Sequence, residues 1–113
     1  MKIEIISTAM DDLRDIYNYI SNVLNNPIAA ERIIKNVRQA FLSISNMPFI
    51  GQSLNNKINT DTSFRFFTCG NYLIFYLVEE NHVAIHRIIY GKRDYAKILF
   101  KANFNADDKD IES

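Results

Sequence analysis

The chain has 113 residues, which is enough for one domain with a sizeable core that needs neither disulfides nor a structural metal. Its single cysteine, Cys69, cannot form an internal disulfide, and the sequence opens with no stretch of signal-peptide type. No apolar run approaches the roughly 20 residues that a membrane-spanning helix needs. We therefore expect a cytoplasmic protein that does not enter a membrane.

The formal net charge is zero, but the charges are unevenly distributed. Residues 107–113 hold four acids and one base, whereas residues 1–106 hold 12 bases and 9 acids. This small basic excess is weaker than that of proteins whose main task is to grip a nucleic-acid backbone, so it favours a protein partner and leaves RNA open. We predict one domain over residues 1–104 and an acidic, disordered tail over residues 105–113.

The first half of the chain predicts a strand at residues 2–6, followed by two helices. Thr8 is the expected cap of the first helix, which runs to about Asn25. Asn26 and Pro27 suit the cap and first position of the second helix, which runs to about Asn46. The apolar positions recur at helical spacing and predict one buried stripe on each helix: Leu13, Ile16, Tyr17, Ile20, Val23 and Leu24 on the first, and Ala30, Ile33, Ile34, Val37, Ala40, Phe41 and Ile44 on the second.

The second half predicts three consecutive strands at residues 64–69, 72–78 and 83–90, after a polar loop at residues 52–63. Gly70 and Asn71 suit a tight turn between the first two of these strands. The predicted fold class is therefore α+β, in the order β-α-α-β-β-β-α, with an N-terminal helical hairpin packed on a small, mostly antiparallel, twisted sheet.

The central strand, residues 72–78, is apolar on both faces. One face is expected to pack on the helices. A short terminal helix that carries Tyr95, Ile98, Leu99 and Phe104 is too small to hide the other face, so we expect that face to be covered by a partner.

A basic turn follows the last strand: Gly91 lets the backbone leave the sheet, and Lys92, Arg93 and Asp94 follow it. We expect Arg93 to be exposed and functional, with an ion pair to a helix carboxylate as the alternative. Arg87, placed between Ile85 and Ile89 on one strand face, is either functional or an interior arginine paired with an acid such as Asp94.

The two histidines and the cysteine predict neither a metal site nor a catalytic nucleophile. His82 and His86 are too far apart along a strand to share one metal ion, and no cluster of other ligands accompanies them. Cys69 could nominally act as a nucleophile with either histidine as its base. The sequence, however, shows no motif of hydrogen-bond donors that would stabilise an oxyanion. We therefore predict neither a metal nor a cofactor.

The order of elements, together with residues 72–76, 85–91 and 92–95, resembles the RelE/ParE toxins of bacterial type II toxin-antitoxin modules over about residues 2–100. The resemblance implies growth inhibition and a cognate antitoxin, bound in a hetero-oligomer, whose chain covers apolar surface of the toxin. The residues expected to bind the antitoxin are Phe67, Leu73, Phe75 and Leu77.

The family divides by target. RelE-like members cleave mRNA on the ribosome with several convergent cationic and acid-base groups. In this chain the matching positions hold Phe64, Phe66, Leu73 and Leu99, and only Arg93 is retained. The sequence therefore resembles the ParE-like branch more closely.

That branch implies inhibition of DNA gyrase without a catalytic residue, through a surface of aromatic and arginine anchors. The residues expected to contact the target are Arg65, Arg87, Lys92, Arg93 and Tyr95. Two alternatives stay open. One is a ribosome-dependent endoribonuclease that acts on mRNA with relocated groups at Arg65, Arg87, Arg93 and His86, and the other is an inactive toxin fold that serves as an interaction module.

Overall fold

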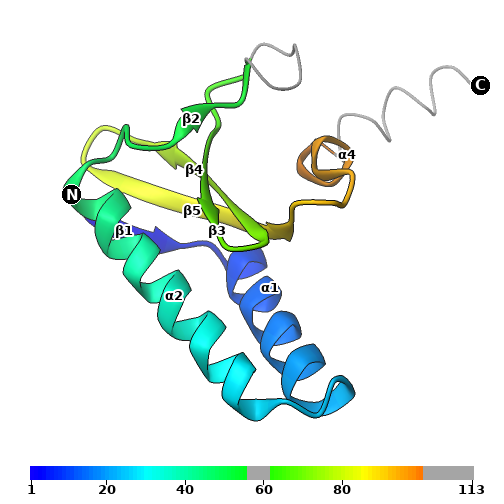
Figure 1. Ribbon diagram of the computed structural model, residues 1–113. Helices are drawn as coiled ribbons and strands as arrows, with labels where there is room; N and C mark the ends of the chain where they lie inside the picture. Colours follow the sequence, from blue (N-terminus) through cyan, green and yellow to red (C-terminus); the bar gives the residue numbers. More distant parts are fainter. Residues whose placement is uncertain (56–61, 101–113) are drawn as a thin grey trace, which may run out of the picture.

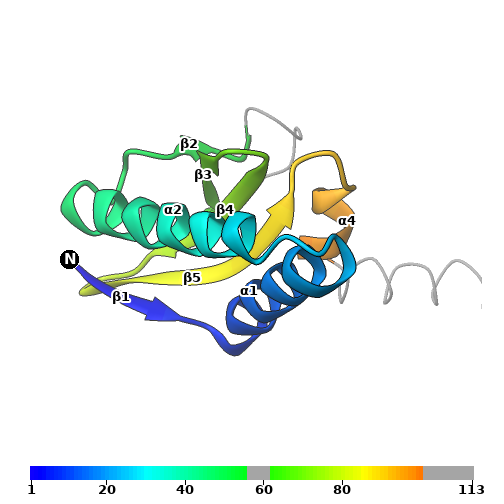
Figure 2. The ribbon, with the colours of Figure 1, turned by 60° about the horizontal axis from the view of Figure 1, so that its bottom comes forward.

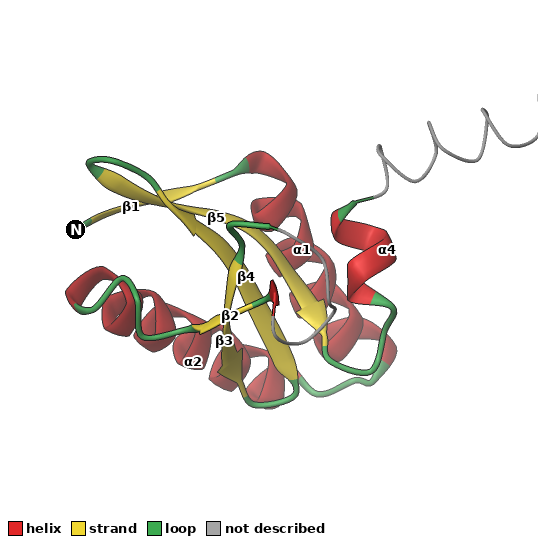
Figure 3. Cartoon of the chain, turned by 90° about the horizontal axis from the view of Figure 1, so that it is seen from above, coloured by secondary structure: helices red, strands yellow, loops and turns green. Residues whose placement is uncertain are grey.

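Five strands form one mixed sheet in the computed structural model, which describes residues 1–55 and 62–100. The strand order is β1-β5-β4-β3-β2, with β1 parallel to β5 and the other neighbours antiparallel (Figure 3). The predicted α+β class is confirmed; the two-residue β2 lies where a loop was predicted. The elements are β1 (Lys2–Ile5), α1 (Ser7–Asn18), the π-helix η1 (Tyr19–Val23), α2 (Pro27–Asn46), β2 (Gln52–Ser53), β3 (Arg65–Cys69), β4 (Tyr72–Val78), β5 (His82–Tyr90) and α4 (Tyr95–Leu99).

Helices α1 and α2 form a hairpin on one side of the sheet, and α4 lies on the other side (Figures 1 and 2). Phe104 and the acidic tail at residues 105–113 lie outside the described residues. The main core fills the space between the hairpin and the sheet. Its buried members are Ala9, Val37, Ala40, Ile44, Ile74, Tyr76, Val83, Ile85 and Ile88.

The hairpin joint differs from the sequence prediction. Asn26 caps α2 as predicted, because its side-chain oxygen accepts a hydrogen bond from the Ala29 amide at 3.1 Å. Val23 and Leu24, predicted to be buried, are 68% and 55% exposed. Val23 ends the π-helix and Leu24 follows it, so the wider turn of the π-helix breaks the 3.6-residue spacing on which the prediction rested.

Helix α1 begins without the predicted side-chain cap. Ile6 occupies the cap position, and the Thr8 hydroxyl instead donates to the His86 carbonyl at 2.9 Å. The prediction that Thr8 caps its own helix is therefore wrong. Its hydroxyl joins the first turn of α1 to β5, two elements that are far apart in the sequence.

The outer face of the sheet, away from the hairpin, is covered by the chain itself. Phe75 is 0% exposed and packs under α4, where the Tyr95 ring lies 5.4 Å from the Phe75 ring. The expectation of an uncovered face is wrong because Leu54, within the predicted loop, and Phe64, directly after it, help α4 to cover this face. The outer cluster contains Leu54, Phe66, Leu73, Phe75 and Ile89, with Phe64, Tyr95, Ile98, Leu99 and Phe100 packed against it.

A β-bulge interrupts β5 at His86. Phe75 on β4 pairs with Arg87, but the next residue, Tyr76, pairs with Ile85, so His86 is an extra residue in β5. The bulge shifts the alternation of side chains, and Ile85 consequently lies in the main core whereas Ile89 lies in the outer cluster. The prediction that Arg87 shares one face with both isoleucines is therefore wrong.

Tyr76 carries a buried polar contact within the main core. Its hydroxyl accepts from the Gly51 amide at 2.9 Å and donates to the Pro48 carbonyl at 2.8 Å. A side chain at Gly51 would place its Cβ 2.5 Å from that hydroxyl. The close approach explains a glycine here, and it fixes the segment between α2 and β2 against the sheet.

Candidate functional site

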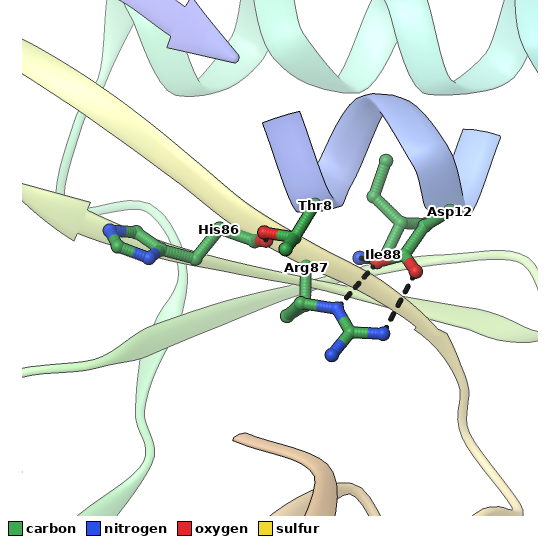
Figure 4. Close-up of polar contacts among 5 residues, drawn as sticks. All are labelled: Thr8, Asp12, His86, Arg87 and Ile88. Carbon is green, nitrogen blue, oxygen red and sulfur yellow. Dashed lines mark hydrogen bonds and ion pairs between the residues drawn. The ribbon is translucent and has the colours of Figure 1, made fainter. Parts of the chain in front are cut away.

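Asp12 on α1 joins the helical hairpin to the bulged part of β5 (Figure 4). Its carboxylate accepts from Arg87 Nε at 2.8 Å, from Arg87 Nη2 at 2.9 Å and from the Ile88 amide at 2.9 Å. Strand β1 pairs with β5 only as far as Ile85, so the β5 edge beyond that point needs another acceptor. Asp12 supplies it.

Arg87 is therefore held in an ion pair with Asp12 rather than with Asp94. The two side chains are 27% and 13% exposed. The hydrogen bond to Asp12 is the main cause that raises the pKa of Arg87, against the lowering effect of burial. The alternative of an interior arginine paired with an acid is thus confirmed, but the acid is Asp12 and not Asp94. A role for Arg87 in target binding stays a prediction.

The basic turn after β5 presents Lys92 and Arg93 to solvent. The Gly91 amide donates to the Asn71 carbonyl at 2.9 Å, and the Arg93 amide donates to the Tyr90 carbonyl at 3.0 Å. Gly91 has no positive φ, so it serves by its close approach to Asn71 and not by a special backbone conformation. Within residues 1–55 and 62–100, no side-chain hydrogen bond or ion pair involves Lys92 or Arg93.

Arg65 lies away from this turn. It stands opposite Tyr76 on β4, whereas Tyr72, at the other end of β4, stands opposite Tyr90 beside the turn. The Arg65 guanidinium donates to the Gly51 carbonyl from Nε at 3.1 Å and from Nη2 at 2.6 Å, and it lies 5.3 Å from the Phe49 ring centroid. The structure therefore does not bring Arg65 together with Arg93.

Tyr95 is the first residue of α4 and half-buried. The Asp94 side chain caps this helix by accepting from the Lys97 amide at 3.3 Å, and the Tyr95 ring packs on Phe75. Tyr95 thus belongs to the cover of the outer face. Its expected contact with the target stays a prediction.

The four residues expected to bind an antitoxin do not share one face. Leu73 and Phe75 belong to the outer cluster, and Leu77 follows at the same alternation. Phe67 packs against the main core instead, because the turn at Gly70 pairs Phe67 with Ile74 and places Phe66 opposite Phe75. Phe67 therefore does not lie on the face that carries Leu73 and Phe75, and its expected contact with an antitoxin stays a prediction.

The histidines and Cys69 occupy separate places. His82 Nε2 lies 3.1 Å from a Glu4 carboxylate oxygen. The His86 ring packs edge-on against Phe64 at 5.3 Å, and burial lowers the pKa of His86. Cys69 packs against the main core, and burial raises its pKa. Among the described residues, no group of three or more metal-type ligands occurs.

A groove of about 780 Å³ lies between the tip of the helical hairpin and the end of β5. Sequence reasoning identified only Arg93 as a site residue here. It did not single out Asp15 and Tyr19, which also line the groove; their spacing of four residues, which places two side chains on one helix face, is the sequence signal that joins them. The lining is completed by Asp12, Ile16, Ile20, Leu24, Asn26, Ala29, Ile33, Asn71, Tyr72, Ile88, Ile89 and Tyr90.

Comparisons with known proteins bear on the fold and on the family separately. The chain resembles the solved structure of the chromosomal ParDE TA system from P. aeruginosa with a TM-score of 0.67 and 18% sequence identity, covering 80% of this chain and 95% of that chain. A search among curated protein sequences found no match. No helix in the described part of the chain is long and apolar enough to cross a membrane. The family model described as "ParE toxin of type II toxin-antitoxin system, parDE" matches residues 3–95, and the chain therefore belongs to this toxin family.

Proposed function

We propose that this toxin inhibits DNA gyrase by binding it and stabilising the cleaved DNA complex, without catalysing a reaction of its own. The observation that carries the proposal is the basic turn, where Lys92 and Arg93 are exposed and make no side-chain ion pair in the described part of the chain. Arginine beside aromatic rings is the usual composition of an interface anchor. Tyr90 and Tyr72 supply such rings next to Arg93.

The residues at the ribonuclease positions support an inhibitor rather than an enzyme. Phe66 and Leu73 are buried in the outer cluster and Phe64 packs against it, so these positions contribute to folding. Cleavage of RNA needs groups that stabilise charge on the phosphate and move protons. Apolar side chains do neither.

We further propose that a cognate antitoxin neutralises the toxin in a cytoplasmic hetero-oligomer by packing on the outer face of the sheet, over Leu73, Phe75 and Leu77. The structural relative is described as a ParDE TA system. In the free chain α4 covers this face, so the antitoxin must displace it. A helix of five residues has little stability of its own, which makes displacement inexpensive.

Expression of the chain alone, followed by assays of DNA and mRNA, tests the gyrase proposal. We expect growth arrest with DNA breaks and intact mRNA, and inhibition of purified gyrase in a supercoiling assay. Co-expression of the antitoxin should restore growth. Codon-specific mRNA cleavage without DNA damage would instead support the ribosome-dependent endoribonuclease.

A further inference from the structure

The groove beside the basic turn has two walls of different origin. One wall comes from the hairpin tip, where Tyr19 and Leu24 are 53% and 55% exposed. The other comes from the end of the sheet, with Tyr72, Tyr90 and Arg93. Ile20 and Ile88 are 6% and 2% exposed and add apolar surface to the lining. The groove is therefore apolar within and aromatic at its walls.

The tyrosines lie close enough to act together. The Tyr72 and Tyr90 rings meet edge to face, with their centroids 5.9 Å apart. Burial raises the pKa of Tyr72, and the nearby Tyr90 and then Tyr19 add to this shift. Such a group provides large, rigid contact area at low conformational cost.

The charged residues of the groove divide into a neutralised pair and two unpaired side chains. Asp12 is neutralised by Arg87. Asp15 on the helical wall and Arg93 on the sheet wall make no side-chain hydrogen bond or ion pair within residues 1–55 and 62–100. Among the described residues, the groove thus offers one unpaired anion on the helical wall and one unpaired cation on the sheet wall.

We propose that this groove receives a segment of the target protein with an apolar or aromatic side chain flanked by one basic and one acidic residue. The apolar side chain enters between Tyr19 and the two sheet tyrosines, the basic residue pairs with Asp15, and the acidic residue pairs with Arg93. This inference rests on the proposed function, because it extends the target contact from Arg93 to the helical hairpin.

Two features favour a protein segment over nucleic acid. A phosphate backbone attracted by Arg93 would also approach the unpaired carboxylate of Asp15. The exposed apolar side chains at the tip, Val23 and Leu24 among them, suit an apolar partner. The groove also lies on the helical side of the sheet, away from the outer face that we assign to the antitoxin, so both partners have a surface of their own.

Charge reversal and ring removal on the hairpin wall test the proposal. We expect Asp15→Lys and Tyr19→Ala each to weaken growth arrest and gyrase inhibition about ten-fold or more, as the loss of an interface anchor does. Tyr19→Phe and Asp15→Glu should remain close to the wild type. Glu80→Lys makes the same change of charge at an exposed turn position outside the groove and serves as the matched control.

Each variant is also measured for thermal unfolding and for co-purification with the antitoxin, both of which should be unchanged. Full toxicity of Asp15→Lys and Tyr19→Ala would overturn the proposal. So would loss of antitoxin binding with toxicity retained, which would assign the groove to the antitoxin, or stronger inhibition by Asp15→Lys, which would assign it to nucleic acid. If the wild type fails to inhibit gyrase while both variants lose growth arrest, the gyrase proposal fails and the groove remains the target site.

Discussion

Removal of the Asp12 carboxylate should destabilise the fold more than its position near the helix surface suggests. Asp12→Ala deletes three hydrogen bonds and leaves Arg87, which is only 27% exposed, without a counterion. Breaking a fully buried ion pair costs about 3–5 kcal/mol. Because both side chains retain some solvent contact, we expect the free energy of unfolding to fall by about 2–3 kcal/mol.

The neighbouring residue provides a control. Asp11 also pairs with an arginine, Arg14, at 3.1 Å, but these side chains are 63% and 65% exposed. Asp11→Ala should therefore cost less than about 0.5 kcal/mol. Urea unfolding of both variants, and of Arg87→Ala alone and combined with Asp12→Ala, measures the difference. Equal costs for the two aspartates, or additive effects of Asp12→Ala and Arg87→Ala, would refute the role that we assign to the pair.

Three further predictions concern separate parts of the molecule. Tyr76→Phe should lower the free energy of unfolding by about 1–3 kcal/mol in urea, because it leaves the Gly51 amide and the Pro48 carbonyl without their buried partner. The lowered pKa of His86 means that the unfolded chain binds a proton first, so stability should decline as pH falls below 6.5, and His86→Gln should reduce that decline in unfolding curves measured at several pH values. Arg93→Ala should weaken growth arrest without changing the melting temperature, whereas wild-type arrest would remove the basic turn from the target site.

Sequence patterns predicted the class and the order of the main elements because each rests on local signals. Helical periodicity, the cap at Asn26 and the turn at Gly70 are all properties of short segments. The register of the sheet could not be predicted from such local signals, because it is set by contacts between residues far apart in the sequence. The bulge at His86 is a shift in the pairing of β4 with β5, and the Asp12 contact beside it joins residues more than seventy positions apart.

The candidate site was predicted in part for the same reason. Arg93 follows a strand end and was expected to be exposed, which the structure shows. The sequence left open which face Phe67 occupies, because one residue of register moves a side chain to the other face of a strand. The cover over Phe75 was missed because it is assembled from α4, from Leu54 within the predicted loop and from Phe64 directly after that loop, none of which carries a strong pattern alone.

The ion pair of Asp12 links the stability of the fold to the geometry of the proposed target site. Asp15 lies one helical turn beyond Asp12 on α1, so the two side chains project from the same side of the helix. The Asp12 carboxylate accepts from the Ile88 amide and so holds this side of α1 against β5. Tyr90 lies two residues after Ile88 on β5 and lines the groove. The contact that closes the open edge of β5 therefore also sets the distance between the two walls of the groove. A carboxylate that Arg87 already neutralises can in this way determine how the hairpin and the basic turn are presented together.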